Sequence, residues 1–334
     1  MRSAARLITI LRMQAVVIEE FGPPSVLQLR EVADPECAPG EVLIEIAFAS
    51  VTFVETQIRA GRAPHPSMLP ALPFIPGNGV AGIVVAAGSG VSTGVIGARV
   101  VSTTGGTGGD AQFVSVAATE LILIPDEVQL ADAAALLADG RTALALIDLA
   151  EIEAGATVLV EAAAGGVGSL LVQLARHAGA RVVAAAGGAE KLQLARSLGA
   201  AVVVDYRRDG WVDEVGAALD GGAVDVVFDG VGGAIGRDAA TLIGSGGRLC
   251  TFGMASGSFA MVDAEELSTR GIGVVRGSGA SREQMAGLSA RALRAAADGV
   301  LHPVIGQRAA LAHASGAHQA IEDRAVLGKT LLVP

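Results

Sequence analysis

The sequence has few cysteines and few aromatic residues. Its 334 residues include two cysteines, Cys37 and Cys250, which lie in separate segments and predict a reduced, cytoplasmic protein rather than a secreted one held by disulfides. Aromatic residues make up 3% of the chain, so a binding pocket built mainly on ring stacking is hard to assemble. Phe53, Phe74 and Phe252 are the main candidates for such contacts.

Long apolar runs and clusters of basic residues are also missing. No apolar run reaches the roughly 18 residues of a membrane-spanning helix, although the mean hydropathy is +0.53. The net charge of −10 argues against nucleic acid as a partner. The apolar run Leu7–Leu11 resembles a signal peptide, but it is short and ends at Arg12. We therefore expect residues 1–12 to be a tail or a misassigned start, and the folded chain to begin at Met13.

The length of the chain predicts two domains, and the first of them has a β pattern. Short apolar segments separated by glycine and proline predict a mostly antiparallel β domain over residues 13–125. Its strands are expected at 14–18, 42–47, 82–86, 99–102, 112–116 and 121–124.

Strand and helix patterns alternate in the rest of the chain, which predicts a doubly wound parallel sheet. A helical region over 130–149, interrupted at Gly140, precedes the first strand, and another helix is expected over 281–298. The last 35 residues predict a helix near 313–322 and a final strand over 329–333. The strands of the sheet are expected at 157–161, 181–186, 201–205, 224–228, 247–252 and 271–276.

Residues 157–191 carry the most specific pattern in the chain. The apolar run Val158–Val160 leads into the small residues Ala162–Gly168, and apolar residues then recur at helical spacing until Gly179. A second apolar run follows at 181–186. A glycine turn between strand and helix lets the backbone approach a pyrophosphate, whose charge then faces the helix N-terminus. This order of elements predicts a dinucleotide-binding unit.

The second strand of this unit lacks the acidic residue that is typical of NAD-binding chains. That acid bonds the ribose 2′-hydroxyl about 20 residues after the glycines, but residues 184–189 contain none. A 2′-phosphate therefore has room, and Lys191 and Arg207 offer it positive charge. The alternative is that both are ordinary surface charges. Lys191 is one of only two lysines in the chain, the other being Lys329, and we interpret the pattern as NADPH binding.

Several further motifs follow in a fixed order along the chain. They are Phe21–Gly22 followed by Leu27, Pro39–Leu43, Thr52–Thr56 with Arg59 and Gly61, Pro76–Gly82, Gly108–Ala111, Arg141–Ala143, Glu190–Lys191, Leu198–Ala200, Asp225–Asp229, Gly246–Arg248 and Gly328–Lys329. With the glycine turn, they make residues 13–334 resemble the zinc-free quinone oxidoreductase (zeta-crystallin-like) branch of the medium-chain dehydrogenase/reductase superfamily. The resemblance implies an α/β fold with a GroES-like β domain at 13–125 and a Rossmann doubly wound parallel sheet at 126–299. It also implies that residues 300–334 return to the first domain and that the active site lies between the domains.

The resemblance implies which residues contact NADPH. Lys329 is implied at the phosphates, with a surface charge on the last strand as the alternative. The other implied contacts are Gly165, Gly166 and Val167 at the pyrophosphate, Gly188, Lys191, Tyr206 and Arg207 at the 2′-phosphate and adenine, Phe252, Gly253 and Met254 at the nicotinamide ribose, and Gly277 and Ser278 after the last strand of the sheet.

The chain departs from the zinc-dependent members of the superfamily. Where these carry a catalytic cysteine and a Gly-His-Glu segment, this sequence has Ser50–Thr52 and Pro76–Gly79, without thiolate or imidazole. A structural four-cysteine lobe cannot form from two cysteines. We therefore expect no metal site and interpret the histidines as ordinary surface or helix residues: His65, His177, His302, His313 and His318.

The implied catalytic residues are Thr52, Phe53 and Thr142. Thr52 stands where this branch usually has asparagine, beside the nicotinamide and the substrate oxygen, and keeps a hydroxyl with a shorter reach. Thr142 is implied to bond the nicotinamide carboxamide, and neighbouring Arg141 faces either the cleft or a surface ion pair. Glu55, where aspartate is common, is either catalytic or a capping carboxylate.

Without zinc, hydrogen bonds alone must polarise the acceptor, which suits quinones and α,β-unsaturated carbonyl compounds. The resemblance thus implies an NADPH-dependent, zinc-independent reductase, with Thr52 and cofactor hydroxyls at the oxyanion and the proton coming from water or Thr52. An enone or enoyl reductase of a biosynthetic pathway and a low-turnover NADPH-binding protein remain as alternatives. Homodimers paired edge to edge through residues 271–276 are also implied.

Overall fold

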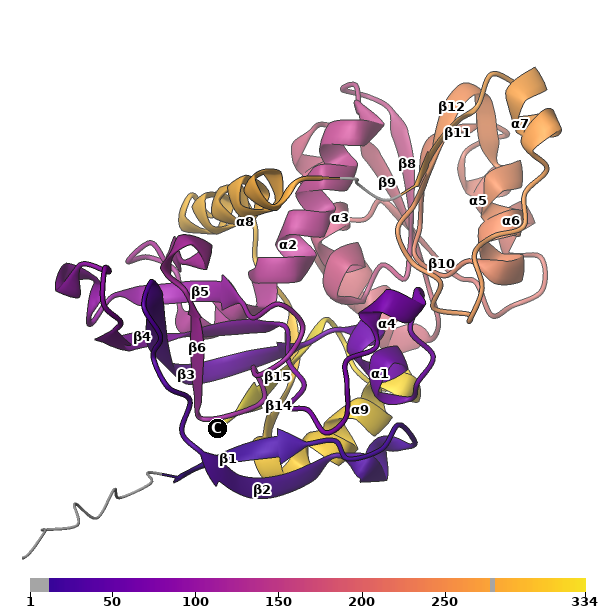
Figure 1. Cartoon of the computed structure of the whole chain (residues 1–334). Coiled ribbons are helices and arrows are strands. Elements are labelled where there is room, and N and C mark those ends of the chain that lie inside the picture. Colours follow the sequence, from indigo (N-terminus) through magenta and orange to yellow (C-terminus); the bar gives the residue numbers. More distant parts are fainter. Residues whose placement is uncertain (1–11, 277–279) are drawn as a thin grey trace, which may run out of the picture. The chain divides into compact units, whose positions relative to one another are not determined.

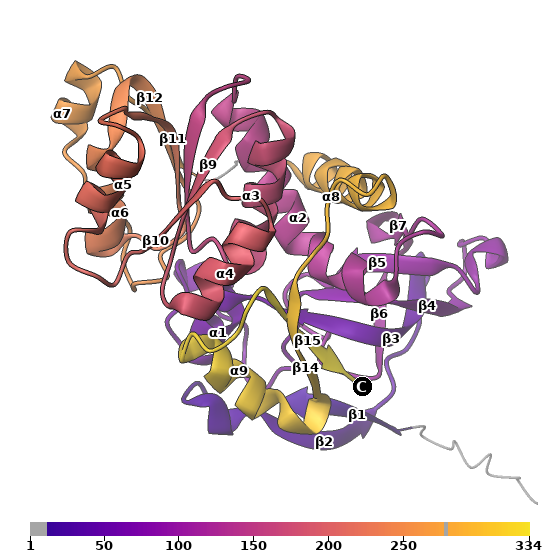
Figure 2. The same ribbon diagram turned by 180° about the vertical axis from the view of Figure 1, so that it is seen from behind.

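The computed structural model describes residues 12–276 and 280–334, and these form two compact units. The first unit contains the described residues through Ile124, together with Arg308–Ala325 and Thr330–Pro334. The second contains the described residues of Pro125–Gln307 and also Val326–Lys329. Each unit is built on its own sheet (Figures 1 and 2).

The first unit is organised by the long strand β3 (Glu41–Val51). Alternate residues of β3, Val42, Ile44 and Ile46, are buried in the core, which is the period expected of a strand with one covered face. The sheet runs in the order β14-β15-β3-β4-β5-β7, with β6 also paired to β3, while β1 and β2 form a separate antiparallel pair. The other bounds are β1 (Arg12–Val17), β2 (Gln28–Ala33), β4 (Gly79–Ala87), β5 (Arg99–Thr103), β6 (Phe113–Ala117), β7 (Ile122–Leu123), β14 (Ile305–Ala310), β15 (Lys329–Val333), α1 (Phe53–Arg59) and α9 (Ala314–Glu322).

The second unit holds a six-stranded parallel sheet in the order β10-β9-β8-β11-β12-β13. This is the order of a doubly wound Rossmann sheet, so the predicted fold class is confirmed. The strands are β8 (Thr157–Glu161), β9 (Arg181–Ala186), β10 (Val202–Asp205), β11 (Val224–Asp229), β12 (Ile243–Thr251) and β13 (Gly273–Arg276). The helices are α2 (Leu130–Ala150), α3 (Gly166–His177), α4 (Ala189–Ser197), α5 (Trp211–Ala218), α6 (Gly233–Thr241), α7 (Ala264–Thr269) and α8 (Arg282–Ala297).

Both faces of the parallel sheet are covered, as its nearly continuous apolar strands require. Leu159, Val183 and Val227 point to the face on which Trp211 and Val215 of α5 pack. Figure 1 shows α5 and α6 on that side and α2 and α3 on the other. Since the topology reverses between β8 and β11, the carboxyl ends of these two strands mark the crevice where doubly wound sheets bind ligands.

The expectation that Gly140 interrupts the helical region was wrong, because α2 is continuous from Leu130 to Ala150. A Cβ atom at Gly140 would lie 2.8 Å from the Cβ of Ala292 in α8, so glycine is needed for the close approach of the two helices. The hydroxyl of Ser289 in α8 also donates to the carbonyl of Leu137 at 3.0 Å.

Among the residues that the structure describes, no helix, α2 included, is long and apolar enough to cross a membrane.

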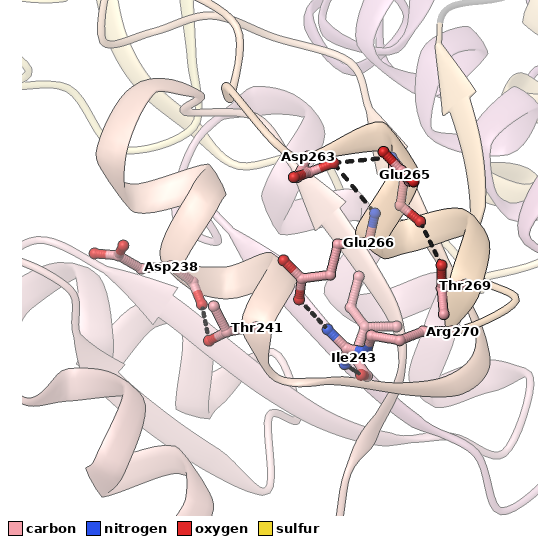
Figure 3. Close-up of polar contacts among 8 residues, drawn as sticks. All are labelled: Asp238, Thr241, Ile243, Asp263, Glu265, Glu266, Thr269 and Arg270. Carbon is pink, nitrogen blue, oxygen red and sulfur yellow. Dashed lines mark hydrogen bonds and ion pairs between the residues drawn. The ribbon is translucent and has the colours of Figure 1, made fainter.

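The short helix α7 is anchored by polar contacts (Figure 3). The side chain of Asp263 caps it by accepting from the amides of Glu265 and Glu266, at 2.9 and 3.2 Å. At its other end Arg270 pairs with Glu266 and donates to the carbonyl of Ile243, the first residue of β12. These contacts fix α7 to the sheet immediately before β13.

Candidate functional site

The turn between β8 and α3 depends on glycine. Gly165 donates its amide to the carbonyl of Ala162 at 2.8 Å, and α3 begins at the next residue. A Cβ atom at Gly168 would lie 2.2 Å from the same carbonyl oxygen, so only glycine allows the helix to pack this closely on the turn. The predicted pyrophosphate residues Gly165, Gly166 and Val167 are partly exposed here. The first amides of α3 therefore remain available to an anion.

A buried ion pair adjoins this turn. Lys329, 3% exposed, places its Nζ 3.0 Å from Oδ1 of Asp139 in α2. The alternative of a surface charge at Lys329 is therefore wrong. The other carboxylate oxygen of Asp139 lies 2.0 Å from the place of a Cβ atom at Gly166, and thus covers the first residue of α3. The sequence interpretation missed Asp139.

The end of β9 is covered by Arg207, which follows the neighbouring strand β10. Arg207 donates through Nε and one terminal nitrogen to the carboxylate of Asp205, at 3.0 and 2.8 Å. Its side chain lies over two glycines, with atoms 2.9 and 3.0 Å from the places of Cβ atoms at Gly187 and Gly188. Tyr206 packs partly against the core, and Lys191 lies in the first turn of α4.

The end of β9 does have an acidic neighbour, Asp205 at the end of β10, although the segment after β9 carries no acid at the expected position. The carboxylate of Asp205 accepts the amide of Gly188 at 3.0 Å, and the hydrogen bonds from Arg207 lower the pKa of Asp205 to about 2. Arg207 itself is exposed and balances that charge. Asp205 is the last residue of β10, and its position at a strand end beside Tyr206 was the signal that could have identified it.

The loops after β11 and β12 pack on each other. A Cβ atom at Gly230 would lie 2.5 Å from the ring of Phe252, and one at Gly253 would lie 2.5 Å from the carbonyl of Gly230. Phe252, Gly253 and Met254 are all partly exposed. Of the other residues predicted to contact the cofactor, Gly277 and Ser278 lie outside the described residues.

Two carboxyl groups that the sequence interpretation missed lie at the topological switch point. Glu161 ends β8 and Asp229 ends β11, and both are fully buried. Asp229 accepts the amides of Val231 and Gly232 at 3.1 and 2.6 Å, and Glu161 accepts the amide of Val231 at 3.3 Å. Burial, together with the charge of Asp229 and a hydrogen bond to it, raises the pKa of Glu161 well above its usual range. The neutral form of Glu161 is therefore favoured over a wider pH range than in an exposed glutamate.

In the first unit Thr52 precedes α1 and is held by Glu55. Oε2 of Glu55 accepts from the amide and the hydroxyl of Thr52, at 2.5 and 2.7 Å, while Oε1 accepts the amide of Asn78 at 2.8 Å. Glu55 thus fulfils the capping role that was one of its two interpretations. The guanidinium carbon of Arg324 lies over the ring of Phe53, 6.0 Å from the ring centroid.

A further buried carboxyl in this unit, Asp110, was also missed. It is 2% exposed, and its Oδ1 has no hydrogen-bond partner within the described residues. Burial, and to a lesser extent the charge of Glu55, raises the pKa of Asp110 well above its usual range.

The remaining predicted residues lie in helices. Thr142 bonds back to the carbonyl of Ala138 at 2.9 Å within α2. Arg141 beside it is partly buried, and burial, opposed by the charge of Asp139, lowers its pKa. His318 of α9 is buried, and burial, with the charge of Arg59, lowers its pKa to about 3. No group of three or more His, Cys, Asp or Glu side chains that could hold a metal occurs in the described parts of the chain.

Comparison with known proteins gives matches over both units. Residues 38–126 match the alcohol dehydrogenase GroES-like domain family, and residues 166–294 match the zinc-binding dehydrogenase family. A probable quinone oxidoreductase of Schizosaccharomyces pombe is 34% identical over 95% of this chain and 96% of its own length. A 2-haloacrylate reductase of a Burkholderia species is 30% identical over 96% of this chain and 99% of its own. The structure of Escherichia coli quinone oxidoreductase complexed with NADPH superimposes with a TM-score of 0.86 at 30% identity, covering 96% of this chain and all of that one.

Proposed function

Because the chain belongs to the quinone oxidoreductase branch of the medium-chain dehydrogenase/reductase superfamily, we propose that it is an NADPH-dependent reductase of quinones or α,β-unsaturated carbonyl compounds. The observation that carries this proposal is the glycine turn at the end of β8, beside the reversal of strand order. Similarity to an NADPH-bound quinone oxidoreductase supports it.

The residues of the second unit fit a phosphorylated dinucleotide. Gly168 brings α3 against the turn, and the partly exposed backbone of Gly166 and Val167 at the start of the helix leaves amides for a pyrophosphate. Arg207, held over Gly188 by Asp205, and Lys191 would hold the 2′-phosphate. When bound, NADPH supplies the hydride.

The chemistry of the first unit depends on how Thr52 is held. Its hydroxyl donates to Glu55, so it must turn from Glu55 to donate to an oxyanion that forms on the substrate. Glu55 fixes the backbone of Thr52 through the amide, which positions the hydroxyl. Removal of one oxyanion donor costs about 10²–10³ in kcat, so Thr52→Val is expected to lose up to that factor while NADPH affinity is retained.

A panel of acceptors tests the proposal. NADPH oxidation is followed with simple quinones, enones and short unsaturated acids, and NADPH binding is measured separately by nucleotide fluorescence. Turnover of quinones supports quinone reduction. Preference for unsaturated acids or enones supports the second candidate, which the similarity to a 2-haloacrylate reductase favours. Tight NADPH binding without turnover of any acceptor would identify a low-turnover binding protein instead.

Cofactor preference has its own test. We propose that Lys191 and Arg207 select NADPH through the 2′-phosphate, so Lys191→Ala and Arg207→Ala should lower kcat/KM for NADPH and leave that for NADH nearly unchanged. Arg196→Ala, which removes a charge from the far end of the same helix α4, is the matched control. An unchanged NADPH/NADH ratio in both site variants would refute the assignment.

We also propose that catalysis is independent of zinc. The proposal is supported by the first unit, where Thr52 and the Asn78 backbone occupy Glu55 and where Ser50–Thr52 and Pro76–Gly79 contain no thiolate or imidazole. Metal analysis of the active protein tests it. Stoichiometric zinc whose removal by a chelator abolishes turnover would contradict the proposal.

We further propose a homodimer in the cytoplasm. Strand β13 is the last strand in the order of its sheet and is paired with β12, and Val274 on it is exposed. Both cysteines are free, which suits a reducing compartment. Light scattering should give twice the chain mass of 33.3 kDa, and a monomer would contradict the proposal.

A further inference from the structure

The ion pair of Lys329 and Asp139 joins the end of the chain to the glycine turn. Both side chains are almost fully buried, and 3.0 Å separates Nζ from Oδ1. Burying two charges is costly unless each finds its partner, so neither can lose the other without consequence. The pair is therefore a candidate for a role beyond packing.

The carboxylate of this pair lies against the first residue of α3. Its Oδ2 is 2.0 Å from the place of a Cβ atom at Gly166, whereas its Oδ1 faces Lys329. An unneutralised carboxylate here would occupy the positive end of the helix and repel an anion that approaches the same amides. Lys329 supplies the charge that prevents this.

The position of Lys329 is fixed by backbone contacts on both sides. The amide of Gly328 donates to the carbonyl of Ala164 in the turn at 2.7 Å, and the amide of Lys329 donates to the carbonyl of Val304 at 2.7 Å. Gly328 has a φ of +61°, and a Cβ atom there would lie 2.0 Å from the carbonyl of Val304. The segment is thus inserted between the turn and Val304, and delivers the ammonium group to one place.

We propose that Lys329 is a positioning residue that neutralises Asp139, so that the turn between β8 and α3 accepts the pyrophosphate of a dinucleotide. Lys329 acts through Asp139 and not as a direct ligand of the phosphates. This inference rests on the proposed function, because it assigns a role in cofactor binding. It goes beyond the proposed function because it names the two charged residues, Lys329 and Asp139, that allow the turn to bind a pyrophosphate.

The test is a double-mutant cycle in which the equilibrium affinity for NADPH is measured. Lys329→Met removes the ammonium group that is bonded to Asp139 and leaves Arg141 as the other cation that interacts with this carboxylate, so binding should weaken by about tenfold or more. Asp139→Asn removes the negative charge and should bind NADPH at least as tightly as the wild type. The double variant D139N/K329M has neither charge, and should return to within about threefold of the wild type.

Any result other than the three expected affinities would overturn the inference. If the double variant binds as weakly as Lys329→Met, Lys329 contacts the phosphates directly. If all variants bind like the wild type and differ only in thermal unfolding of the free protein, the pair is structural. If Lys329→Met does not fold, the double variant and Asp139→Asn still decide, because direct contact predicts weak binding for the double variant.

The nucleotide NADH provides a second readout. Both nucleotides carry the pyrophosphate, so Lys329→Met should weaken NADPH and NADH by the same factor, whereas Arg207→Ala should weaken NADPH alone. A selective loss of NADPH in Lys329→Met would overturn the inference. Failure of the wild type to bind either nucleotide would overturn the proposed function and this inference with it, whereas wild-type binding with unchanged variants overturns this inference alone.

Discussion

Replacing Glu161 with glutamine should make the stability of the second unit less dependent on pH. Glu161 and Asp229 are fully buried at adjacent strand ends, and burial, with the nearby charge of Asp229, raises the pKa of Glu161 well above its usual range. The folded protein therefore keeps a proton that the unfolded chain releases once the pH exceeds the ordinary glutamate pKa of about 4.3.

The sign follows from this difference in proton binding. For an acid whose pKa is raised by folding, the stabilising contribution is complete below the unfolded pKa and is lost as pH rises toward the folded pKa. Within that window one retained proton lowers the free energy of unfolding by about 1.4 kcal/mol for each pH unit. The side-chain amide that E161Q introduces replaces the protonated carboxyl as a donor to Asp229 and does not titrate. The free energy of unfolding of E161Q should therefore rise, relative to that of the wild type, by about 1.4 kcal/mol for each pH unit within this window.

Trp211 offers a probe for this measurement. It is the only tryptophan of the chain and lies in the core of the second unit, where it packs with Leu159 and Val183. Urea unfolding followed by its fluorescence from pH 5.5 to 8.5 gives the slope for each protein. Asp229→Asn is the companion variant, and should reduce the slope because it removes a charge that raises the pKa of Glu161. Parallel slopes for wild type and E161Q would refute the reasoning.

Three further substitutions test the packing of the second unit. Gly168→Ala should abolish NADPH binding, because its Cβ atom would lie 2.2 Å from the carbonyl oxygen of Ala162, and nucleotide fluorescence checks this. Gly287→Ala, at an open and exposed position of α8, should instead raise stability by about 0.5–1 kcal/mol in thermal unfolding and keep NADPH affinity. Phe228→Ala empties a fully buried site and should cost about 3–5 kcal/mol in urea unfolding, and a loss under 1 kcal/mol would contradict the packing.

The sequence predicted the Rossmann sheet closely because buried parallel strands and their turns leave local signals. Strands predicted at 157–161 and 181–186 agree with β8 and β9, and membership of the quinone oxidoreductase branch is confirmed. The prediction failed at Gly140, where local propensity favours a break. Contact with Ala292 of α8 offsets a helix cost of about 1 kcal/mol, and that contact is not visible in the local pattern.

The buried charges of the site could not be predicted from local pattern. Glu161, Asp229 and Asp205 each end an apolar strand, but which strand ends are neighbours depends on the order of the sheet. Asp139 and Lys329 are 190 residues apart and meet only because the end of the chain enters the second unit. The sequence interpretation proposed the glycines and basic residues as phosphate contacts, because their types indicate phosphate binding. It missed the carboxylates Asp205 and Asp139, which bond to Arg207 and Lys329.

Arg207 and Lys329, two of the cations near the proposed dinucleotide site, should respond differently to salt. The side chain of Arg207 is 62% exposed, whereas that of Lys329 is 4% exposed. Salt shortens the Debye length from about 30 Å at 0.01 M to about 3 Å at 1 M, and it screens exposed charges far more than buried ones. The loss of NADPH affinity caused by Arg207→Ala should therefore shrink as salt is added, while the loss caused by Lys329→Met should persist. In a chain of net charge −10, this would mean that the exposed cation attracts an anionic ligand and the buried one keeps its binding turn neutral. Equal salt dependence of the two losses would show that the burial of Lys329 does not set its contribution.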